Sequence, residues 1–488
     1  MKISELVYEN ECISYPQDKE KEIDNISLDP FKLTSGTLFI ALRRKSYKIE
    51  DLKCHLESQS GLTVVCDENL ALDEKKIDVI RVKNLRKISA YIYSRFYKIN
   101  YDKLTFIGVT GTNGKTTTAT LIERLIMNIG TVGFIGTGKI RINGLEISDP
   151  LYSMTTPDVD LLYKTLKEME NRGCKYIVME ASSHALYFDK LAPIFFKVSL
   201  FTNLSREHGD FHRSEEEYFR AKFKLFSQSK IGIFNLDDSH SKRAFFEFVG
   251  EKHSVAISSP GDVTGCDVSL LSPSKSEFIY REKSVIFKVE LPIGGIYNIY
   301  NALMAIKCAL VLSVSAIEIK STLKTMTLID GRGETVSERP RIIIDYAHTP
   351  TAIESELFFL KSQLLSGQKL IALFGCGGER DREKRAEMAK NAEKYSDLLI
   401  ISSDNSRGES QMQIFKDILK GISKKEKARV ISSRKKAIIY AINSASESDT
   451  VVIIGKGHER YNQDKKGKAP FDERVIIKEE LERLGYSV

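Results

Sequence analysis

The chain has 488 residues, more than one hydrophobic core usually supports, so about three domains are expected. Hydrophobic residues make up 42% and charged residues 28%, and the net charge of +7 is spread along the chain, which excludes a disordered or fibrous protein and gives no sign of a nucleic-acid-binding arm. No stretch reaches the ~18 apolar residues of a membrane span and the amino-terminal segment is too polar for a signal peptide, so we expect a cytoplasmic protein that does not insert into a membrane.

Residues 1–99 are predicted to form a small α/β domain. The apolar runs GTLFIAL and GLTVVC alternate with polar turns, and RKISAYIYSRFYKI has the apolar spacing of an amphipathic helix. The seven cysteines of the whole chain are scattered and include no CxxC pair, which indicates neither a disulfide framework nor a zinc site.

Residues 100–336 are predicted to form a larger domain that binds a nucleotide. The apolar run LTFIGV leads into the glycine-containing loop TGTNGK and then into the helical stretch TTTATLIERLIM, the order of a phosphate-binding unit. Two further apolar runs, YIVME and KVSLFTNL, are separated by helical patterns. A mostly parallel sheet of the P-loop ATPase type is therefore expected.

Residues 337–488 are predicted to form a Rossmann-like, doubly wound domain. The apolar runs RIIIDY, KLIALFG, DLLIISS, ARVISS and TVVIIG alternate with helical patterns. Ligands of such sheets bind beyond the carboxyl ends of the strands, where the loops DYAHTP, GCGGERD, SDNSRGES and GKGHER fall. These polar loops predict a site at one edge of the sheet.

The loop from Gly111 to Thr116 has what a triphosphate requires. Its glycines allow close backbone approach, Lys115 can reach the β and γ phosphates, and the Thr116 hydroxyl can bind Mg²⁺. The usual first glycine of a Walker motif would fall at Val109, so the motif is irregular. An ordinary glycine-rich turn before a helix is the alternative, which the flanking strand and helix disfavour.

The segment GVTGTNGKTTT resembles the phosphate loop of the Mur ligases and of folylpolyglutamate synthetase. The segments LYSMTTPD, MEASSHAL, FTNLSREHGDFH, YFRAKFKLF, YNIYNAL, DGRGE, DYAHTP, DNSR and GKGHE follow in order and are similar to motifs of the MurE type, which adds the third residue of the peptidoglycan stem peptide. The resemblance implies an ATP-dependent ligase that activates a carboxylate as an acyl phosphate, joins it to an amine and releases ADP and phosphate.

The resemblance also assigns residues to ATP, to Mg²⁺ and to catalysis. The residues expected at ATP are Gly111, Thr112, Asn113, Gly114, Lys115, Thr116, Thr117, Asn298, Asn301, Arg332, Asp345 and His348. Those expected at Mg²⁺ are Thr116, Glu180, His208 and Lys222, the last as a carbamate, and Lys115, Glu180, His208 and Lys222 are expected to be catalytic. Taken alone, Glu180 could be an ordinary strand-end carboxylate, His208 a surface or core histidine, and Lys222 a solvated lysine on a helix.

For the incoming amino acid the resemblance implies Arg380, Asp404, Asn405, Arg407, Gly455 and Glu459. Arg407 offers a planar fork for a carboxylate, which favours meso-diaminopimelate over lysine, whose distal ammonium it would repel. Ser406 stands where the family usually has proline, and by itself the segment DNSR is also common turn chemistry.

The carboxylate substrate implied by the resemblance is a UDP-MurNAc-dipeptide, held by Thr155, Thr156, Ser182 and Lys190. Phe188 and Lys190 replace a glutamine and an arginine of the family, and the segment Asp29-Pro30-Phe31 replaces its Asp-Ser-Arg. These changes remove hydrogen-bonding groups from the expected nucleotide-sugar site.

Three hypotheses follow. The first is a ligase, expected to be monomeric, that joins meso-diaminopimelate to the UDP-MurNAc-dipeptide. The second is a divergent paralogue that ligates an amino acid to another carboxylate. The third is a catalytically silent nucleotide-binding or scaffold protein, against which the presence of Lys115, Glu180, His208 and Lys222 argues.

Overall fold

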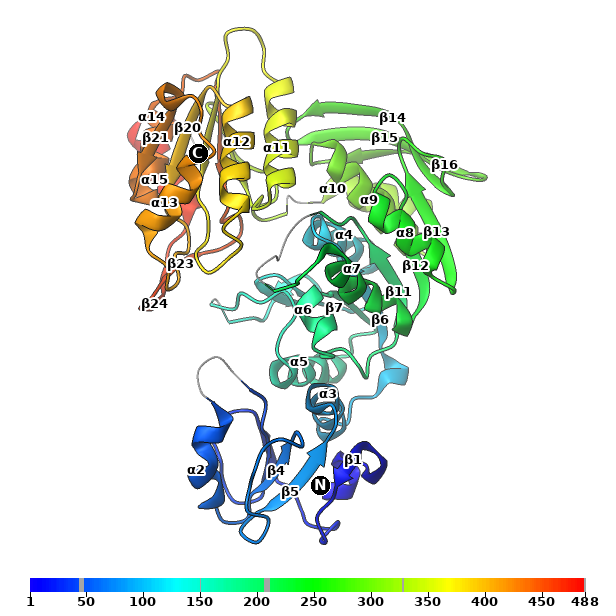
Figure 1. The fold of residues 1–488 in the computed structure, drawn as a ribbon. Coiled ribbons are helices and arrows are strands. Elements are labelled where there is room, and N and C mark those ends of the chain that lie inside the picture. The colour runs from blue at the N-terminus through cyan, green and yellow to red at the C-terminus, as the bar shows by residue number, and fades with distance from the viewer. Residues whose placement is uncertain (44–47, 150, 206–210, 327–328, 487–488) are drawn as a thin grey trace.

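The computed structural model describes residues 1–43, 48–149, 151–205, 211–326 and 329–486. Within these ranges the strands form three large sheets that follow one another along the chain, and helices cover their faces (Figure 1). The predicted α/β class with three successive domains is confirmed. The boundaries expected after residues 99 and 336 stay predictions, and the second of them falls inside β17 (Glu334–Glu338).

The N-terminal domain is built on a sheet with the strand order β1-β5-β4-β3-β2. Its strands are β1 (Cys12–Ser14), β2 (Asn25–Ser27), β3 (Thr37–Ile40), β4 (Thr63–Cys66) and β5 (Asp78–Val82). The predicted helix is present as α3 (Leu85–Phe96), and it begins where the Asn84 side chain accepts a hydrogen bond from the Lys87 backbone N–H at 3.0 Å. It packs against α5 (Val159–Asn171) of the central domain (Figure 1).

The central sheet has the order β16-β15-β14-β13-β12-β11-β6-β10-β7-β8-β9. Its strands are β6 (Thr105–Thr110), β7 (Val132–Gly136), β8 (Lys139–Ile142), β9 (Leu145–Glu146), β10 (Tyr176–Glu180), β11 (Phe196–Phe201), β12 (Ser229–Asn235), β13 (Glu251–Ala256), β14 (Val263–Ser272), β15 (Lys275–Glu282) and β16 (Val285–Leu291). Pairing is parallel from β7 to β14 and antiparallel at both edges. The expectation of a mostly parallel sheet therefore holds for its middle.

Strand β6 lies in the middle of this sheet, between β10 and β11. Its residues from Phe106 to Thr110 are buried because helices cover both faces, which explains the continuous apolar run. It leads into α4 (Lys115–Ile126), which packs against α9 (Ile296–Val311). The loop between β6 and α4 consequently sits at the carboxyl edge of the sheet.

The C-terminal sheet has the order β17-β18-β22-β19-β20-β21. The five predicted strands are present as β18 (Arg341–Asp345), β19 (Leu370–Phe374), β20 (Leu398–Ser402), β21 (Ala428–Ile431) and β22 (Thr450–Ile454), all parallel. Its helices are α11 (Pro350–Ser362), α12 (Lys384–Tyr395), α13 (Gln411–Leu419), α14 (Arg434–Asn443) and α15 (Glu473–Arg483). All seven cysteines of the chain have free thiols, and none of the described helices is long and apolar enough to cross a membrane.

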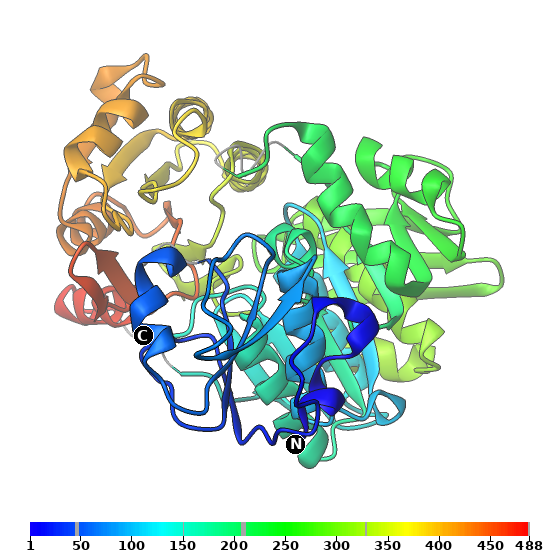
Figure 2. The same ribbon diagram turned by 60° about the horizontal axis from the view of Figure 1, so that its bottom comes forward.

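A hairpin of β23 (Tyr461–Asp464) and β24 (Gly467–Pro470) projects from the C-terminal domain towards the central domain (Figure 1). Lys468 of this hairpin donates hydrogen bonds to Leu151 O at 2.5 Å and to Ser153 Oγ at 2.7 Å. Figure 2 shows the C-terminal domain to one side of the central domain, with the N-terminal domain in front. The hairpin therefore connects the C-terminal domain to the central domain.

A second polar contact joins these two domains at α11. The Tyr297 hydroxyl of α9 donates a hydrogen bond to the Glu356 carboxylate of α11. Glu356 is 4% exposed, and its burial, with Asp345 nearby, raises the pKa of its carboxyl group to about 8. Glu356 is thus held mainly as the neutral acid at neutral pH.

This raised pKa makes stability depend on pH. The folded protein keeps the Glu356 proton from its ordinary pKa of 4.5 up to about 8, a range in which the unfolded chain has lost it. This group therefore lowers the free energy of unfolding as the pH rises through that window, by at most about 1.4 kcal/mol per pH unit. In Glu356→Gln the side chain is a neutral amide that does not titrate, so this contribution to the pH dependence of the free energy of unfolding is absent.

Thermal unfolding measured between about pH 6 and 9 should show the Glu356→Gln variant gaining stability relative to the unmodified protein up to about pH 8, and no further change above it. The exposed Glu387→Gln on α12 is the control and should show no such trend. A difference in melting temperature that stays constant from pH 6 to 8 would contradict the prediction.

Candidate functional site

The loop between β6 and α4 can only be built with glycine at two positions. Gly111 has φ +144°, and a Cβ placed there would lie 1.9 Å from Thr202 Oγ1. Gly114 has φ +82°, and its Cβ would lie 2.3 Å from Asn301 Oδ1. Any side chain at either position would displace the loop from β11 or from α9, so these two glycines fix its path.

Two lysines converge on the carbonyl of Gly111. Lys115 Nζ donates hydrogen bonds to Gly111 O at 3.0 Å and to Thr112 O at 2.8 Å. Lys222 Nζ, from α7 (Glu215–Phe223), donates to Gly111 O at 2.6 Å, and the Lys222 side chain is 1% exposed. The loop thus brings together two of the predicted catalytic residues.

Of the two neighbouring lysines in the segment YFRAKFKLF, Lys222 faces the loop and Lys224 does not. Lys224 lies in the turn after α7 and pairs with Asp189 at 2.6 Å. Burial of an ammonium group is costly, so a lysine held inside the protein next to a phosphate loop is not the ordinary solvated lysine that the sequence alone allowed.

Glu180 at the end of β10 and Thr116 in the first turn of α4 face one cavity. Glu180 ends β10, is completely buried, and accepts hydrogen bonds from the Thr137 backbone N–H at 2.9 Å and from Thr137 Oγ1 at 3.0 Å. Thr116 Oγ1 accepts a hydrogen bond from Arg332 Nη2 at 3.0 Å. Thr137, which orients the carboxylate, was not singled out from the sequence because its role depends on a partner far along the chain.

These oxygen atoms suit a magnesium ion. Carboxylate and hydroxyl oxygens are the hard donors that Mg²⁺ prefers, and water and phosphate oxygens usually complete its shell. The described residues include no group of three His, Cys, Asp or Glu side chains that could hold a metal by themselves. His208 lies outside the described residues. The donors present therefore fit an ion that is bound together with a phosphate.

A cavity of about 510 Å³, named here the nucleotide cavity, opens on one side of the phosphate loop. It contains most of the residues expected at ATP: Asn113, Gly114, Thr117, Asn298, Asn301, Arg332, Asp345 and His348. Asn301 accepts a hydrogen bond from Thr118 at 3.2 Å and donates one to Asn298 at 3.2 Å, which ties α9 to α4. Of the other residues expected at ATP, Thr112, Lys115 and Thr116 line a second cavity described below, and Gly111 lines neither.

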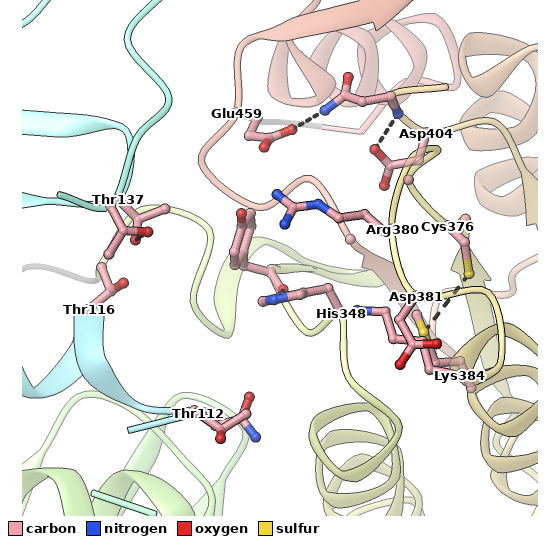
Figure 3. Close-up of a pocket in the computed structure, with 18 of the residues that line it drawn as sticks. Thr112, Thr116, Thr137, His348, Cys376, Arg380, Asp381, Lys384, Asp404 and Glu459 are labelled. Atoms are coloured by element: carbon pink, nitrogen blue, oxygen red, sulfur yellow. Dashed lines mark hydrogen bonds between the residues drawn. The ribbon is translucent and has the colours of Figure 1, made fainter. Parts of the chain in front are cut away.

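A second cavity of about 160 Å³, named here the transfer cavity, lies on the other side of the loop. The central domain contributes Thr112, Asn113, Gly114, Lys115, Thr116, Thr137, Thr155 and Glu180. The C-terminal domain contributes Arg380, Asp404, Asn405, Arg407, Gly455 and Glu459, all six of the residues expected at the amino acid. Figure 3 shows Thr116 and Thr137 facing Arg380 and Glu459 across this cavity.

The two cavities meet at the loop and at the segment that links the domains. Both are lined by Asn113, Gly114, Arg332, Tyr346 and His348. The Arg332 guanidinium lies 4.5 Å from the centre of the Tyr346 ring, a cation–π contact that positions it. Tyr346 was not selected from the sequence, although it lies inside the segment DYAHTP between two residues that were.

The residues expected at the UDP substrate fall into two groups. Thr155 shares a hydrogen bond of 3.0 Å with Thr137, and Thr156 donates to Glu180 O at 2.7 Å and to Ser182 Oγ at 3.2 Å. These three residues therefore surround the end of β10. The fourth residue, Lys190, lies apart from them.

Lys190 lines a small cavity of about 110 Å³ between the N-terminal and central domains. It pairs with Asp158 at 2.5 Å. Arg86 of α3 lies in the same cavity, with its guanidinium 3.8 Å from the centre of the Phe188 ring. Phe188, which replaces a polar residue of the family, thus lies beside an arginine of the N-terminal domain.

The loops that carry the residues expected at the amino acid, residues 375–381, 403–410 and 455–460, are named here the amino-acid loops, and they hold both signs of charge. Arg407 has a left-handed backbone with φ +52°, and its Nη1 donates to Gly378 O at 2.8 Å. Burial raises the pKa of Glu459, and Asp404 adds to the effect. Burial alone would also raise the pKa of Asp404, but the Lys456 and Arg434 cations outweigh it and lower that pKa.

The comparisons with known proteins agree with this geometry. Residues 109–309 match the family model described as the Mur ligase middle domain, and residues 331–457 match the model described as Mur ligase, glutamate ligase domain. A protein of Aquifex aeolicus named UDP-N-acetylmuramoyl-L-alanyl-D-glutamate–2,6-diaminopimelate ligase is 38% identical over 466 residues, which cover 94% of each chain. A protein of the same name from Clostridioides difficile is 36% identical and covers 99% of this chain and 100% of its own.

A solved structure of a protein with that name has a TM-score of 0.69 and 28% sequence identity to this chain, and the match covers 100% of both chains. The similarity thus extends over all three domains, including the N-terminal domain in which the sequence departs from the motifs of the family. The chain belongs to the Mur ligase family.

Proposed function

We propose that the chain joins meso-diaminopimelate to UDP-N-acetylmuramoyl-L-alanyl-D-glutamate in the synthesis of peptidoglycan precursors. Mur ligases are ATP-dependent enzymes that form amide bonds and use Mg²⁺, and this chain is one of them. Relatives that carry the name of the diaminopimelate reaction match 94% to 99% of the chain. The observation that carries the proposal is the transfer cavity, where the phosphate loop faces Arg407 and Glu459.

The reaction needs ATP because a carboxylate is a poor electrophile. The carboxylate of the acceptor attacks the γ phosphorus of ATP, and ADP leaves. The amine of the incoming amino acid then attacks the carbonyl carbon of the acyl phosphate, loses a proton, and expels inorganic phosphate from the tetrahedral intermediate. In each step negative charge accumulates on the oxygen atoms at the reacting centre, so stabilisation of that charge is the main task of the protein.

The cations of the site are placed for that task. Lys115 Nζ lies 3.0 Å from Gly111 O and 2.8 Å from Thr112 O, inside the phosphate loop. Arg332 contacts Thr116 and lines both cavities, so we propose that it reaches the phosphoryl group in transfer. Thr116 and Glu180, with His208 and carbamylated Lys222, would hold Mg²⁺, which supplies further neutralisation of phosphate charge when bound.

The amino-acid loops favour a substrate with two acidic and two basic ends. Arg407 and Arg380 can each bind a carboxylate through a planar pair of N–H donors. Glu459, with Asp404 and Asn405 beside it and Gly455 lining the same cavity, is available for the distal ammonium. Diaminopimelate has both distal groups, whereas lysine has only the ammonium.

The identity of the acceptor depends on the N-terminal domain, which lacks polar groups that the family has for the nucleotide sugar. The Asp29 carboxylate accepts the Phe31 backbone N–H at 3.0 Å in a local turn, and the Phe31 side chain is 69% exposed. These observations favour one second candidate, a MurE-like ligase that acts on a different carboxylate. In either case we propose a monomer that acts in the cytoplasm on small molecules, with Thr155, Thr156, Ser182 and Lys190 at the acceptor.

The purified protein should release ADP and phosphate when ATP, Mg²⁺, UDP-MurNAc-L-Ala-D-Glu and meso-diaminopimelate are all present. Mass spectrometry of the product should show the tripeptide precursor, and lysine should be a much poorer substrate. Product formation only with a different carboxylate would select the second candidate. The absence of turnover with every UDP-MurNAc acceptor would reject the first.

Replacing Arg407 with alanine should raise the KM for meso-diaminopimelate about 10- to 100-fold, because a charge-assisted pair of hydrogen bonds to its distal carboxylate is lost. The discrimination between diaminopimelate and lysine should fall by a similar factor, while the KM for ATP stays unchanged. The matched control is Arg429→Ala, an exposed arginine on β21. Unchanged discrimination in Arg407→Ala would show that another group selects the distal carboxylate.

We also propose that Lys222 carries CO₂ as a carbamate. The Lys222 ammonium first loses a proton, and the neutral amine then attacks CO₂, forming a nitrogen–carbon bond and releasing a second proton, so the cation becomes an anion. The structure supports this in one respect: Lys222 is 1% exposed and lies at the phosphate loop, where an anionic oxygen donor could serve Mg²⁺.

Protein equilibrated with ¹³C-bicarbonate should give a carbamate signal in its ¹³C NMR spectrum that is lost in Lys222→Ala and kept in Lys224→Ala. Lys222→Ala should lower kcat by about 10²–10³, as expected for loss of a group that stabilises transferring charge. Lys224→Ala, whose lysine pairs with Asp189, should stay within about twofold of the unmodified protein. A fully active protein without a carbamate signal would disprove the modification.

A further inference from the structure

Lys456 lies beneath the amino-acid loops and is completely buried. It follows β22 in the segment GKGHER, and its Nζ donates a hydrogen bond to Asn405 Oδ1 at 3.0 Å. The same ammonium lies 3.6 Å from Glu459 Oε2 and 3.9 Å from Asp404 Oδ1. One buried cation thus contacts three residues that line the transfer cavity.

These contacts fix the orientation of the Asn405 amide. Asn405 Oδ1 accepts from Lys456 and also from the Gln463 backbone N–H at 2.9 Å. Asn405 Nδ2 donates to Glu459 Oε2 at 2.7 Å (Figure 3). A reversed amide would place its NH₂ group against two donors, so only the observed orientation of the amide satisfies all of its partners. The consequence is a defined direction for the Glu459 carboxylate.

The charges of this cluster leave room for one more cation. Asp404 and Glu459 are two buried acids, and Lys456 supplies one positive charge between them. Arg434, the next cation, is already hydrogen-bonded to the Glu473 carboxylate at 2.6 Å. Two carboxylates that share one ammonium retain a net negative charge, which a ligand ammonium can neutralise.

We propose that Lys456 is a positioning residue that fixes Asn405 and Glu459, so that the transfer cavity takes amino acids with a distal ammonium. This inference rests on the proposed amino-acid ligase function and extends it to a residue that does not line the cavity. Without Lys456 the two acids would repel each other, and the pKa of Glu459, already raised by burial and by Asp404, would rise further. A protonated Glu459 attracts an ammonium only weakly.

Several other groups face Glu459 and enter the argument. They are Asp404, Arg434, Lys456, Tyr461, Lys468 and Tyr346. Arg380 and Arg407 line the same cavity. Among these groups Lys456 is the cation that also donates a hydrogen bond to Asn405. Its removal therefore changes both the positive charge beside Glu459 and the direction in which the Glu459 carboxylate points.

The test is the affinity for amino acids, measured by calorimetry on the full-length protein in the presence of an ATP analogue. Lys456→Met should weaken the binding of diaminopimelate, lysine and ornithine about tenfold or more at pH 7 and leave the binding of the nucleotide unchanged. The loss should shrink as the pH is raised, because a higher pH favours the ionised form of Glu459 even without Lys456. Lys456→Arg, which keeps the charge, should restore part of the affinity, and Lys436→Met on the exposed face of α14 is the control.

A double-mutant cycle separates positioning from a general effect on the fold. If Lys456 acts through Glu459, Lys456→Met should add little to the loss caused by Glu459→Gln. Additive losses, or a loss that does not change with pH, would overturn the inference, as would a wild-type protein that binds no amino acid with a distal ammonium. Strong binding of lysine or ornithine but not of diaminopimelate would instead reject the proposed substrate and leave the role of Lys456 intact.

Discussion

Two ammonium groups lie within 3.0 Å of a single backbone carbonyl, that of Gly111, and the rest of the site is arranged around them. The glycines at 111 and 114 let the loop that carries this carbonyl lie close to Thr202 after β11 and to Asn301 of α9. The loop separates the nucleotide cavity from the transfer cavity. The position of the phosphate loop thus sets where each substrate can lie.

The amino-acid loops depend on a similar principle in the C-terminal domain. Arg385 is completely buried, pairs with Glu409 at 2.7 Å and donates to Gly377 O at 3.2 Å. Arg434 is also buried and donates to Ser403 O at 3.2 Å. Buried cations that donate hydrogen bonds to loop carbonyls reduce the conformational freedom of the loops. The loops therefore hold Arg380 and Arg407 in restricted positions before a substrate binds.

Local pattern was sufficient to predict the strands, the phosphate loop and the order of the domains. The run LTFIGV became β6 because a central parallel strand is buried on both faces, and the glycines of TGTNGK have the conformations that the loop requires. Lys222 and Glu180 were identified through family resemblance, since neither residue type is informative by itself. The structure brings both to the phosphate loop, and their chemical roles stay predictions.

Other parts of the site depend on contacts between distant segments and could not be predicted. Thr137 matters because it faces Glu180, and Lys456 matters because it is buried under Asn405. In the sequence one is a threonine in a turn and the other a lysine between glycines. The raised pKa of Glu356 likewise arises only where α11 meets the central domain.

The contact between the β23–β24 hairpin and the central domain has a consequence for the order of events. Lys468 donates hydrogen bonds to Leu151 O and Ser153 Oγ, and Ser153 lies two residues before Thr155, which lines the transfer cavity. Any widening of the gap between the two domains on this side requires these two hydrogen bonds to break. Exchange of molecules through such a gap would therefore follow release of the hairpin from the central domain.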